Sequence, residues 1–235
     1  MTYLQFHLVF ILPPLLLLGW AYARRSGRPP LRQTWPWVLL VSAIALVFTT
    51  PWDNYLVWRE VWTYGPDRVI GTIGYVPVEE YLFFVLQPLL TGAFLLWIWK
   101  PDRPPAVAAP RSRWIGTAVL LVLALAGIAA LTTTRGLYMG LILAWSAPVL
   151  AGQWAYAGHW FWRRRRLWAL STAIPTAYLW AADRVALHLG IWAISERYTT
   201  GLHLLGLPVE EALFFLVTNL LVVQGVMLFL RIGDD

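Results

Sequence analysis

The chain has 235 residues, of which 59% are hydrophobic and 13% are charged, and its net charge is +6. A soluble domain is about one quarter charged, so most of the surface of this protein must face something other than water. The chain contains no cysteine, which excludes disulfide bonds and thiolate chemistry.

Apolar segments long enough to cross a bilayer recur along the chain. They cover residues 3–23, 35–52, 77–99, 114–131, 136–160, 167–182 and 208–230. A transmembrane helix needs about 20 such residues, and apolar flanks lengthen the shorter segments. The first segment lacks the basic head of a signal peptide, so it counts as a helix. We expect an all-α polytopic membrane protein with seven transmembrane helices.

The basic residues gather in every second connection between these segments. They are Arg24, Arg25, Arg28 and Arg32, then Lys100, Arg103, Arg111 and Arg113, then Arg163 to Arg166. This alternation is typical of a cell-membrane protein whose basic loops are cytoplasmic, and it predicts an outside N-terminus and an inside C-terminus. A nucleic-acid partner would need one contiguous basic surface, so none is expected.

Two parts of the chain repeat each other. Residues 77–84 read Pro-Val-Glu-Glu-Tyr-Leu-Phe-Phe, and residues 208–215 read Pro-Val-Glu-Glu-Ala-Leu-Phe-Phe. The helix that opens each part also carries a proline followed by Trp-Ala-Tyr-Ala, at residues 20–23 and 154–157. The repetition therefore extends over three helices on each side.

We interpret the chain as one membrane domain, residues 1–235, with an internal repeat. The repeats cover 1–100 and 136–235, and the connector 101–135 holds the fourth helix and begins with a Pro-rich loop, 101–110. Because the first helix of each repeat runs in the same direction, the repeats are parallel. Both Glu-Glu pairs should then lie on the same, extracytoplasmic side.

The Glu-Glu pairs are the main candidates for function. Proline and glutamate are common at the start of any helix, where the dipole favours negative charge. Two observations argue for more than a helix start: the pair recurs, and the approach segments 69–76 and 202–207 are largely apolar. Carboxylates in apolar surroundings are costly and usually mark function.

Helical spacing distinguishes the two glutamates of each pair. Residues seven positions apart share a helix face. Gln87 follows Glu80 at that spacing, and Thr218 follows Glu211, whereas apolar residues follow Glu79 and Glu210. We therefore expect the second glutamate of each pair to face the interior of the bundle.

An aspartate ends the second helix of each repeat. Asp53 and Asp183 can join the glutamates in one cluster, or they can be ordinary helix-end residues beside Asn54 and Arg184. Both interpretations stay open. Carboxyl groups that meet at low dielectric hold their protons more tightly, and a group still protonated near neutral pH can act as a general acid.

Aromatic rings flank the carboxylates in both repeats. Ring faces attract cations, so a pocket of acids walled by rings suits carbocation chemistry. The candidate substrate-binding rings are Trp52, Trp58, Trp62, Tyr75, Tyr81, Phe83, Phe84, Trp180, Trp192, Phe214 and Phe215.

Neither a metal nor a cofactor is expected. A di-metal carboxylate site would need Glu-x-x-His motifs, and no histidine stands at that spacing from either pair. A Gly-rich nucleotide-binding motif is also missing, because Gly71-Thr-Ile-Gly74 has neither the spacing nor the strand context.

The motifs resemble those of the flavin-independent lycopene β-cyclases, in their fused single-chain form. The resemblance rests on Pro51-Trp-Asp-Asn-Tyr-Leu-Val-Trp-Arg59 with Ile73-Gly-Tyr-Val-Pro-Val-Glu-Glu-Tyr-Leu-Phe-Phe84, and on Asp183-Arg-Val-Ala186 with Gly206-Leu-Pro-Val-Glu-Glu-Ala-Leu-Phe-Phe215. It implies carotenoid biosynthesis by redox-neutral, proton-initiated cyclisation of lycopene ends. The implied partners are lycopene and other carotenoids, the lipid bilayer, and other enzymes of carotenoid synthesis.

The resemblance also implies roles for the carboxylates. Glu80 or Glu211 would be the acid, and the base would come from Glu79, Glu210, Asp53 or Asp183. The alternatives are a carotenoid-binding protein without enzyme activity and a proton-coupled transporter that uses the carboxylates as a relay. A retinal photoreceptor is disfavoured, because it needs a lysine within the last helix, and the single lysine here is Lys100.

Overall fold

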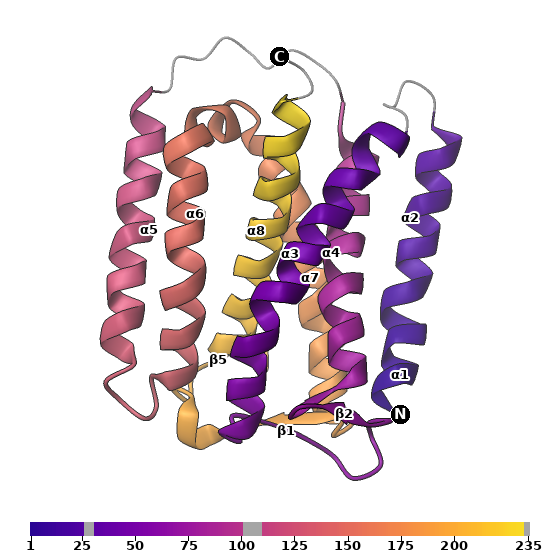
Figure 1. Cartoon of the computed structure of the whole chain (residues 1–235), viewed down its shortest axis with the longest axis vertical. Helices are drawn as coiled ribbons and strands as arrows, with labels where there is room; N and C mark the ends of the chain where they lie inside the picture. Colours follow the sequence, from indigo (N-terminus) through magenta and orange to yellow (C-terminus); the bar gives the residue numbers. More distant parts are fainter. Residues whose placement is uncertain (26–30, 101–109, 233–235) are drawn as a thin grey trace.

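The computed structural model describes residues 1–25, 31–100 and 110–232. Within these ranges, seven long helices stand side by side, with the N-terminus at one end of the bundle and the last helix finishing at the other (Figure 1). Arg28, Arg103 and the predicted loop up to residue 109 lie outside the described residues.

The first membrane helix is built of three consecutive pieces: α1 (Tyr3–Phe6), the π-helical turn η1 (His7–Ile11) and α2 (Leu12–Arg24). Pro13 and Pro14 have no backbone N–H to continue the helical ladder, which favours a widened turn before them. The carbonyl of Phe10 instead accepts a hydrogen bond of 2.8 Å from the Tyr178 hydroxyl. This bond ties the first helix to the sixth.

The other six helices follow in chain order. They are α3 (Leu31–Trp58), α4 (Val78–Ile98), α5 (Pro110–Ala130), α6 (Leu137–Arg163), α7 (Arg165–His188) and α8 (Val209–Ile232). Among the described residues, five of these seven helices, including the first, are long and apolar enough to cross a membrane, whereas α6 and α7 are less apolar. Polar residues such as Thr176 and Asp183 lower the hydropathy of α7, but they are buried inside the bundle.

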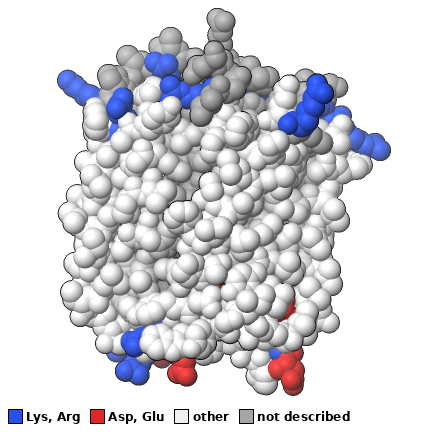
Figure 2. All heavy atoms as spheres, in the orientation of Figure 1, with Lys and Arg blue, Asp and Glu red and all other residues white. Residues whose placement is uncertain are grey.

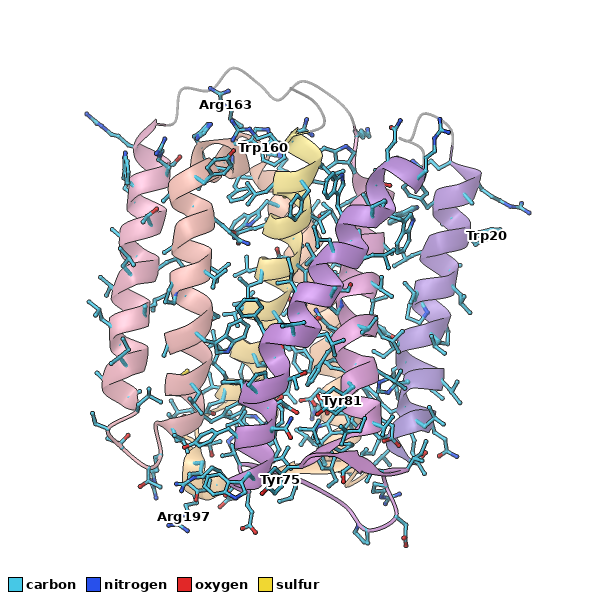
Figure 3. All side chains as sticks on the ribbon, in the orientation of Figure 1. Trp20, Tyr75, Tyr81, Trp160, Arg163 and Arg197 are labelled. Atoms are coloured by element: carbon cyan, nitrogen blue, oxygen red, sulfur yellow. The ribbon has the colours of Figure 1, made fainter. Side chains whose placement is uncertain are left out.

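Charged side chains lie at the two ends of the face shown in Figure 2, with an uncharged belt between them. One end, the basic end, carries Arg24, Arg25, Lys100 and Arg163 to Arg166. Figure 3 places Trp160 and Arg163 at this end and Tyr75 and Arg197 at the opposite one. The predicted all-α polytopic membrane fold is confirmed.

The predicted ends of two helices are wrong. Asp53 and Asp183 lie inside α3 and α7, which continue to Trp58 and His188. The predicted helix ends followed the ends of the apolar segments, 35–52 and 167–182. Both aspartates instead point into the protein, with at most 1% of their surface exposed, so the helices continue past them.

Short β-ribbons close the end of the bundle opposite the basic end, which we call the ribbon end. β1 (Trp62–Tyr64) pairs antiparallel with β4 (Trp192–Ile194), so Trp62 lies opposite Ile194 and Tyr64 opposite Trp192. β2 (Thr72–Ile73) pairs with β3 (Val76–Pro77) ahead of α4, and β5 (His203–Leu204) pairs with β6 (Leu207–Pro208) ahead of α8. A 3₁₀ turn, η2 (Glu196–Tyr198), follows β4. The prediction of an all-helical chain did not include these ribbons.

A buried polar network fixes α4, α7 and α8 together near mid-bundle. The Gln87 amide N–H₂ and the Thr91 hydroxyl both donate to the side-chain carbonyl of Asn219, at 2.5 and 2.6 Å. The amide N–H₂ of Asn219 donates in turn to the Thr176 hydroxyl at 2.9 Å. Polar side chains hydrogen-bonded across helices stabilise their association in lipid, so this network fixes the helices that carry the carboxylates.

Candidate active site

A small cavity at the ribbon end brings side chains from both repeats together. Its lining consists of Tyr3, Phe6, Trp62, Tyr64, Glu80, Phe83, Leu179, Asp183, Trp192, Glu211, Phe214 and Phe215. The cavity volume of about 30 Å³ is enough for about two water molecules. Three carboxyl groups therefore share one small space with aromatic walls.

Glu80 extends into this cavity from the first turn of α4. Its Oε2 accepts hydrogen bonds from the hydroxyls of Tyr3 at 2.7 Å and Tyr64 at 3.1 Å. Burial, and then the negative charge of Glu80, raise the pKa of Tyr64 well above its ordinary value. Tyr64 therefore keeps its proton and remains a donor to the carboxylate.

Glu211 occupies the corresponding place at the start of α8. Its Oε1 accepts a hydrogen bond from the Tyr138 hydroxyl at 2.5 Å. Tyr138 lies in the first turn of α6, and Tyr3 begins α1, so the first helix of each repeat supplies one hydroxyl to the glutamate of its own repeat. The two halves differ in Tyr64, a second donor to Glu80 that comes from β1.

The first glutamates of the pairs turn towards the loops. Glu79 Oε1 accepts the backbone N–H of Ile70 at 2.8 Å, and Glu210 Oε1 accepts the backbone N–H of Thr200 at 2.7 Å. Both side chains are fully buried, yet neither lines the cavity. These hydrogen bonds anchor the loops that precede α4 and α8 to the first turn of each helix. The anchored first turns orient Glu80 and Glu211.

The two aspartates are placed differently. Asp183 lines the cavity, and its Oδ1 accepts a hydrogen bond of 2.9 Å from the indole N–H of Trp192. Asp53 stands beside the cavity, close enough to Glu80 and Glu211 for electrostatic interaction. Neither of its carboxyl oxygens has a hydrogen-bond partner among the described residues. A buried carboxyl group without partners is costly, and such cost is typical of functional sites.

Five of the predicted rings line the cavity: Trp62, Phe83, Trp192, Phe214 and Phe215. Trp52 supports this wall from behind, because it stacks on Phe214 with ring centroids 5.8 Å apart and an interplanar angle of 8°. The wall is therefore continuous from α3 to α8.

The remaining predicted rings lie elsewhere. Trp58 and Tyr75 are 55% and 56% exposed, and the Tyr81 hydroxyl donates to the backbone carbonyl of Ile73. The Trp180 indole N–H donates to the carbonyl of Ala212, and Phe84 lines a separate groove. Nearness to a carboxylate along the chain does not bring these rings to the cavity.

Three hydroxyl groups of the site were not predicted from the sequence. Tyr3, Tyr64 and Tyr138 donate to the two cavity glutamates. Tyr3 and Tyr138 both lie in the first turn of the first helix of a repeat, but the offset of 134 that matches Trp20 with Trp154 places Leu137 opposite Tyr3, so an ungapped alignment misses this pair by one residue. The repeat gives no signal for Tyr64. β1 ends at Tyr64, and the equivalent residue at the end of β4 in the second repeat is Ile194, which has no hydroxyl.

The arrangement suits proton transfer to and from an apolar molecule. It combines acids, hydroxyls that orient them and rings that exclude water. Within the described ranges, no three His, Cys, Asp or Glu side chains are arranged as a metal site.

Comparison with known proteins identifies the family of the chain. The family model described as lycopene cyclase matches residues 1–98 and 135–229. A protein named lycopene beta-cyclase from Halobacterium salinarum is 45% identical over 231 residues, covering 97% of this chain and 95% of the relative. No solved structure matches the chain.

Fungal relatives extend the comparison. The bifunctional lycopene cyclase/phytoene synthase of Blakeslea trispora is 35% identical over 95% of this chain, which spans 38% of that protein. The corresponding protein of Podospora anserina is 39% identical over 82% of this chain. The resemblance predicted from the repeated Pro-Val-Glu-Glu motif is confirmed: the chain belongs to the lycopene cyclase family.

Proposed function

We propose that this protein closes the linear ends of lycopene into β-ionone rings, forming γ- and β-carotene by acid–base catalysis. The observation that carries the proposal is the shared cavity of Glu80, Asp183 and Glu211, enclosed by aromatic rings. The names of the relatives supply the substrate, and the cavity supplies the chemistry.

The reaction needs one proton donor and one proton acceptor. Glu80 or Glu211 gives a proton to the terminal double bond of lycopene, which leaves a tertiary carbocation. The electron pair of a nearby double bond attacks this cation and closes a six-membered ring, moving the positive charge into the ring. An ionised partner then removes a ring proton and restores a double bond. One proton enters and one leaves, so the product is an isomer of the substrate.

Asp183 and Asp53 are the best placed groups to accept that proton. Asp183 lines the cavity beside both glutamates, and Asp53 interacts electrostatically with them. Glu79 and Glu210 are less suited, because each accepts a backbone N–H on the loop side. The wall formed by Trp62, Phe214 and their neighbours stabilises the cation and keeps water from capturing it.

We also propose that the chain is a single domain of two parallel repeats, 1–100 and 136–235, with the connector 101–135 between them. The paired hydroxyls of Tyr3 and Tyr138, each on the glutamate of its own half, support this division. So does the family model, which matches a segment on each side of the connector. The antiparallel pairing of β1 with β4 then joins the two repeats at the ribbon end, beside the cavity.

The charge pattern further supports a cell-membrane protein with its ribbon end outside and its basic end in the cytoplasm. Because the chain has no cysteine, single cysteines can report the orientation. A membrane-impermeant maleimide is expected to label Thr134→Cys in intact cells, and Arg165→Cys only after lysis. The reverse pattern would overturn the proposed orientation.

The function is tested by chromatography of pigments from lycopene-accumulating cells that express the intact chain. We expect new γ-carotene and β-carotene. Lycopene that stays unchanged beside well-folded membrane protein would refute the cyclase and would leave a carotenoid-binding protein instead.

A further inference from the structure

A second, larger space runs along the bundle next to the carboxylate cavity. It is a groove of about 480 Å³ bounded by side chains of α3, α4, α6 and α8. In Figure 1, α3 and α6 flank α8 on the side facing the viewer. Most of its lining side chains are aliphatic or aromatic, with only a few polar groups such as Gln87 and Gln153. We call this space the α3–α6 groove.

We propose that the α3–α6 groove binds the polyene chain of the carotenoid while one end of the molecule reacts at the carboxylates. The inference rests on the proposed function and extends it from the reacting end to the whole substrate. It assigns substrate recognition to residues of α3, α6 and α8 that take no part in proton transfer.

The groove and the carboxylate cavity adjoin each other. Phe83 and Phe214 line both of them. These two rings therefore stand between the apolar groove and the acids, where the end of a bound chain must pass. The cavity itself, at about 30 Å³, is too small for a six-membered ring, so the reacting end must displace side chains at this junction.

The length and direction of the groove match a rod-like ligand. Along α8, its lining extends from Phe214 to Phe229, which corresponds to about 22 Å at the helical rise of 1.5 Å per residue. The path follows the helices from the ribbon end towards the basic end, across most of the roughly 30 Å hydrocarbon layer. A stiff polyene can lie there without bending.

The groove is open to lipid on one side, which gives an apolar substrate a way in. Phe48 of α3 is 70% exposed, and Val149 and Tyr156 of α6 are 49% and 62% exposed. All three line the groove. Lycopene dissolved in the bilayer can therefore enter sideways between α3 and α6 without crossing water. A lipid acyl chain has similar chemistry, and the experiment below separates the two occupants.

Gly225 is the position at which the groove can be narrowed. A Cβ atom there would lie 3.3 Å from Cγ2 of Val41 on α3 and 4.0 Å from the amide nitrogen of Gln153 on α6. A larger side chain would therefore fill the space between these helices. Gly225 is eleven residues beyond Phe214, or about 16 Å from the junction with the cavity.

The test compares two substrates that share the same linear end. One is lycopene, and the other is a truncated apo-lycopenal that ends before it reaches Gly225. In Gly225→Leu we expect conversion of lycopene to fall at least tenfold, while conversion of the short substrate stays near that of the unmodified protein. Gly152→Leu is the matched control, since nothing lies within 4 Å of a Cβ at Gly152, and both rates should be unchanged.

Val149→Trp provides a second obstruction at a half-exposed wall position, should Gly225→Leu fail to fold in a thermal unfolding assay. It is expected to lower lycopene conversion in the same selective way. If both groove variants convert lycopene at the normal rate, the groove holds only lipid and the inference is overturned, although the cyclase stands. If a folded groove variant loses conversion of both substrates equally, the inference is also contradicted. An unmodified protein that converts neither substrate refutes the proposed function instead.

Discussion

Replacing Glu80 or Glu211 with glutamine is expected to slow ring closure at least about 100-fold, the usual contribution of a positioned acid or base. Glutamine keeps the shape of the side chain and an oxygen that accepts the tyrosine hydroxyl, but it has no acidic proton to give. The rate of conversion of lycopene by purified protein in lipid or detergent measures the effect. The hydrogen bonds from Tyr3 and Tyr138 remain, but their acceptor becomes neutral, so the free energy of unfolding should fall by no more than about 1 kcal/mol per bond.

Glu79→Gln and Glu210→Gln are the matched controls, since each changes the neighbouring residue in the same way. Their backbone N–H partners at Ile70 and Thr200 can donate to an amide oxygen as well. We expect them to keep most of the activity and to lose no more than about 1 kcal/mol of stability, as for one weakened hydrogen bond. Equal loss of activity in all four variants would show that a position in the cavity does not distinguish the catalytic glutamates from their neighbours.

The single variants also test whether the repeats act together. Glu80, Asp183 and Glu211 line one cavity, so either glutamine variant alone should abolish most of the activity. Two independent sites would instead leave about half of it in each variant. Residual activity near one half in both would therefore contradict a shared site.

Replacing Asp53 with asparagine is expected to separate activity from stability. Its carboxyl oxygens have no hydrogen-bond partner among the described residues, so the amide loses no hydrogen bond. Thermal stability should stay the same or rise, whereas the rate of ring closure should fall at least tenfold, since an amide cannot exchange a proton as the carboxyl group beside Glu80 and Glu211 can. Such a trade-off between stability and activity is typical of catalytic groups.

Asp183→Asn provides the contrast. Its Oδ1 accepts the indole N–H of Trp192, and hydrogen bonds to a charged acceptor are about twice as strong as neutral ones. Here both activity and thermal stability should fall, the latter by about 1 kcal/mol. If Asp53→Asn destabilises the protein as much as Asp183→Asn does, Asp53 is a structural residue.

Helical periodicity was enough to choose between adjacent glutamates. Gln87 and Thr218 share the faces of Glu80 and Glu211, and these are the glutamates that line the cavity. The rings were harder to predict. Phe83 and Phe214 lie on the same helices as the acids, whereas the exposed Tyr75 is as close in sequence but belongs to a turn.

The sequence by itself determined the membrane class, the seven helices and the inward-facing glutamates, because hydropathy and helical spacing are local properties of the chain, and the repeated Pro-Val-Glu-Glu motif indicated the family. Only the tertiary structure decided which hydroxyls reach those acids. Tyr3 and Glu80 are 77 residues apart, and Tyr138 and Glu211 are 73 apart. The β1–β4 ribbon and the α3–α6 groove likewise arise where helices distant in sequence pack together, and no local pattern records which faces meet.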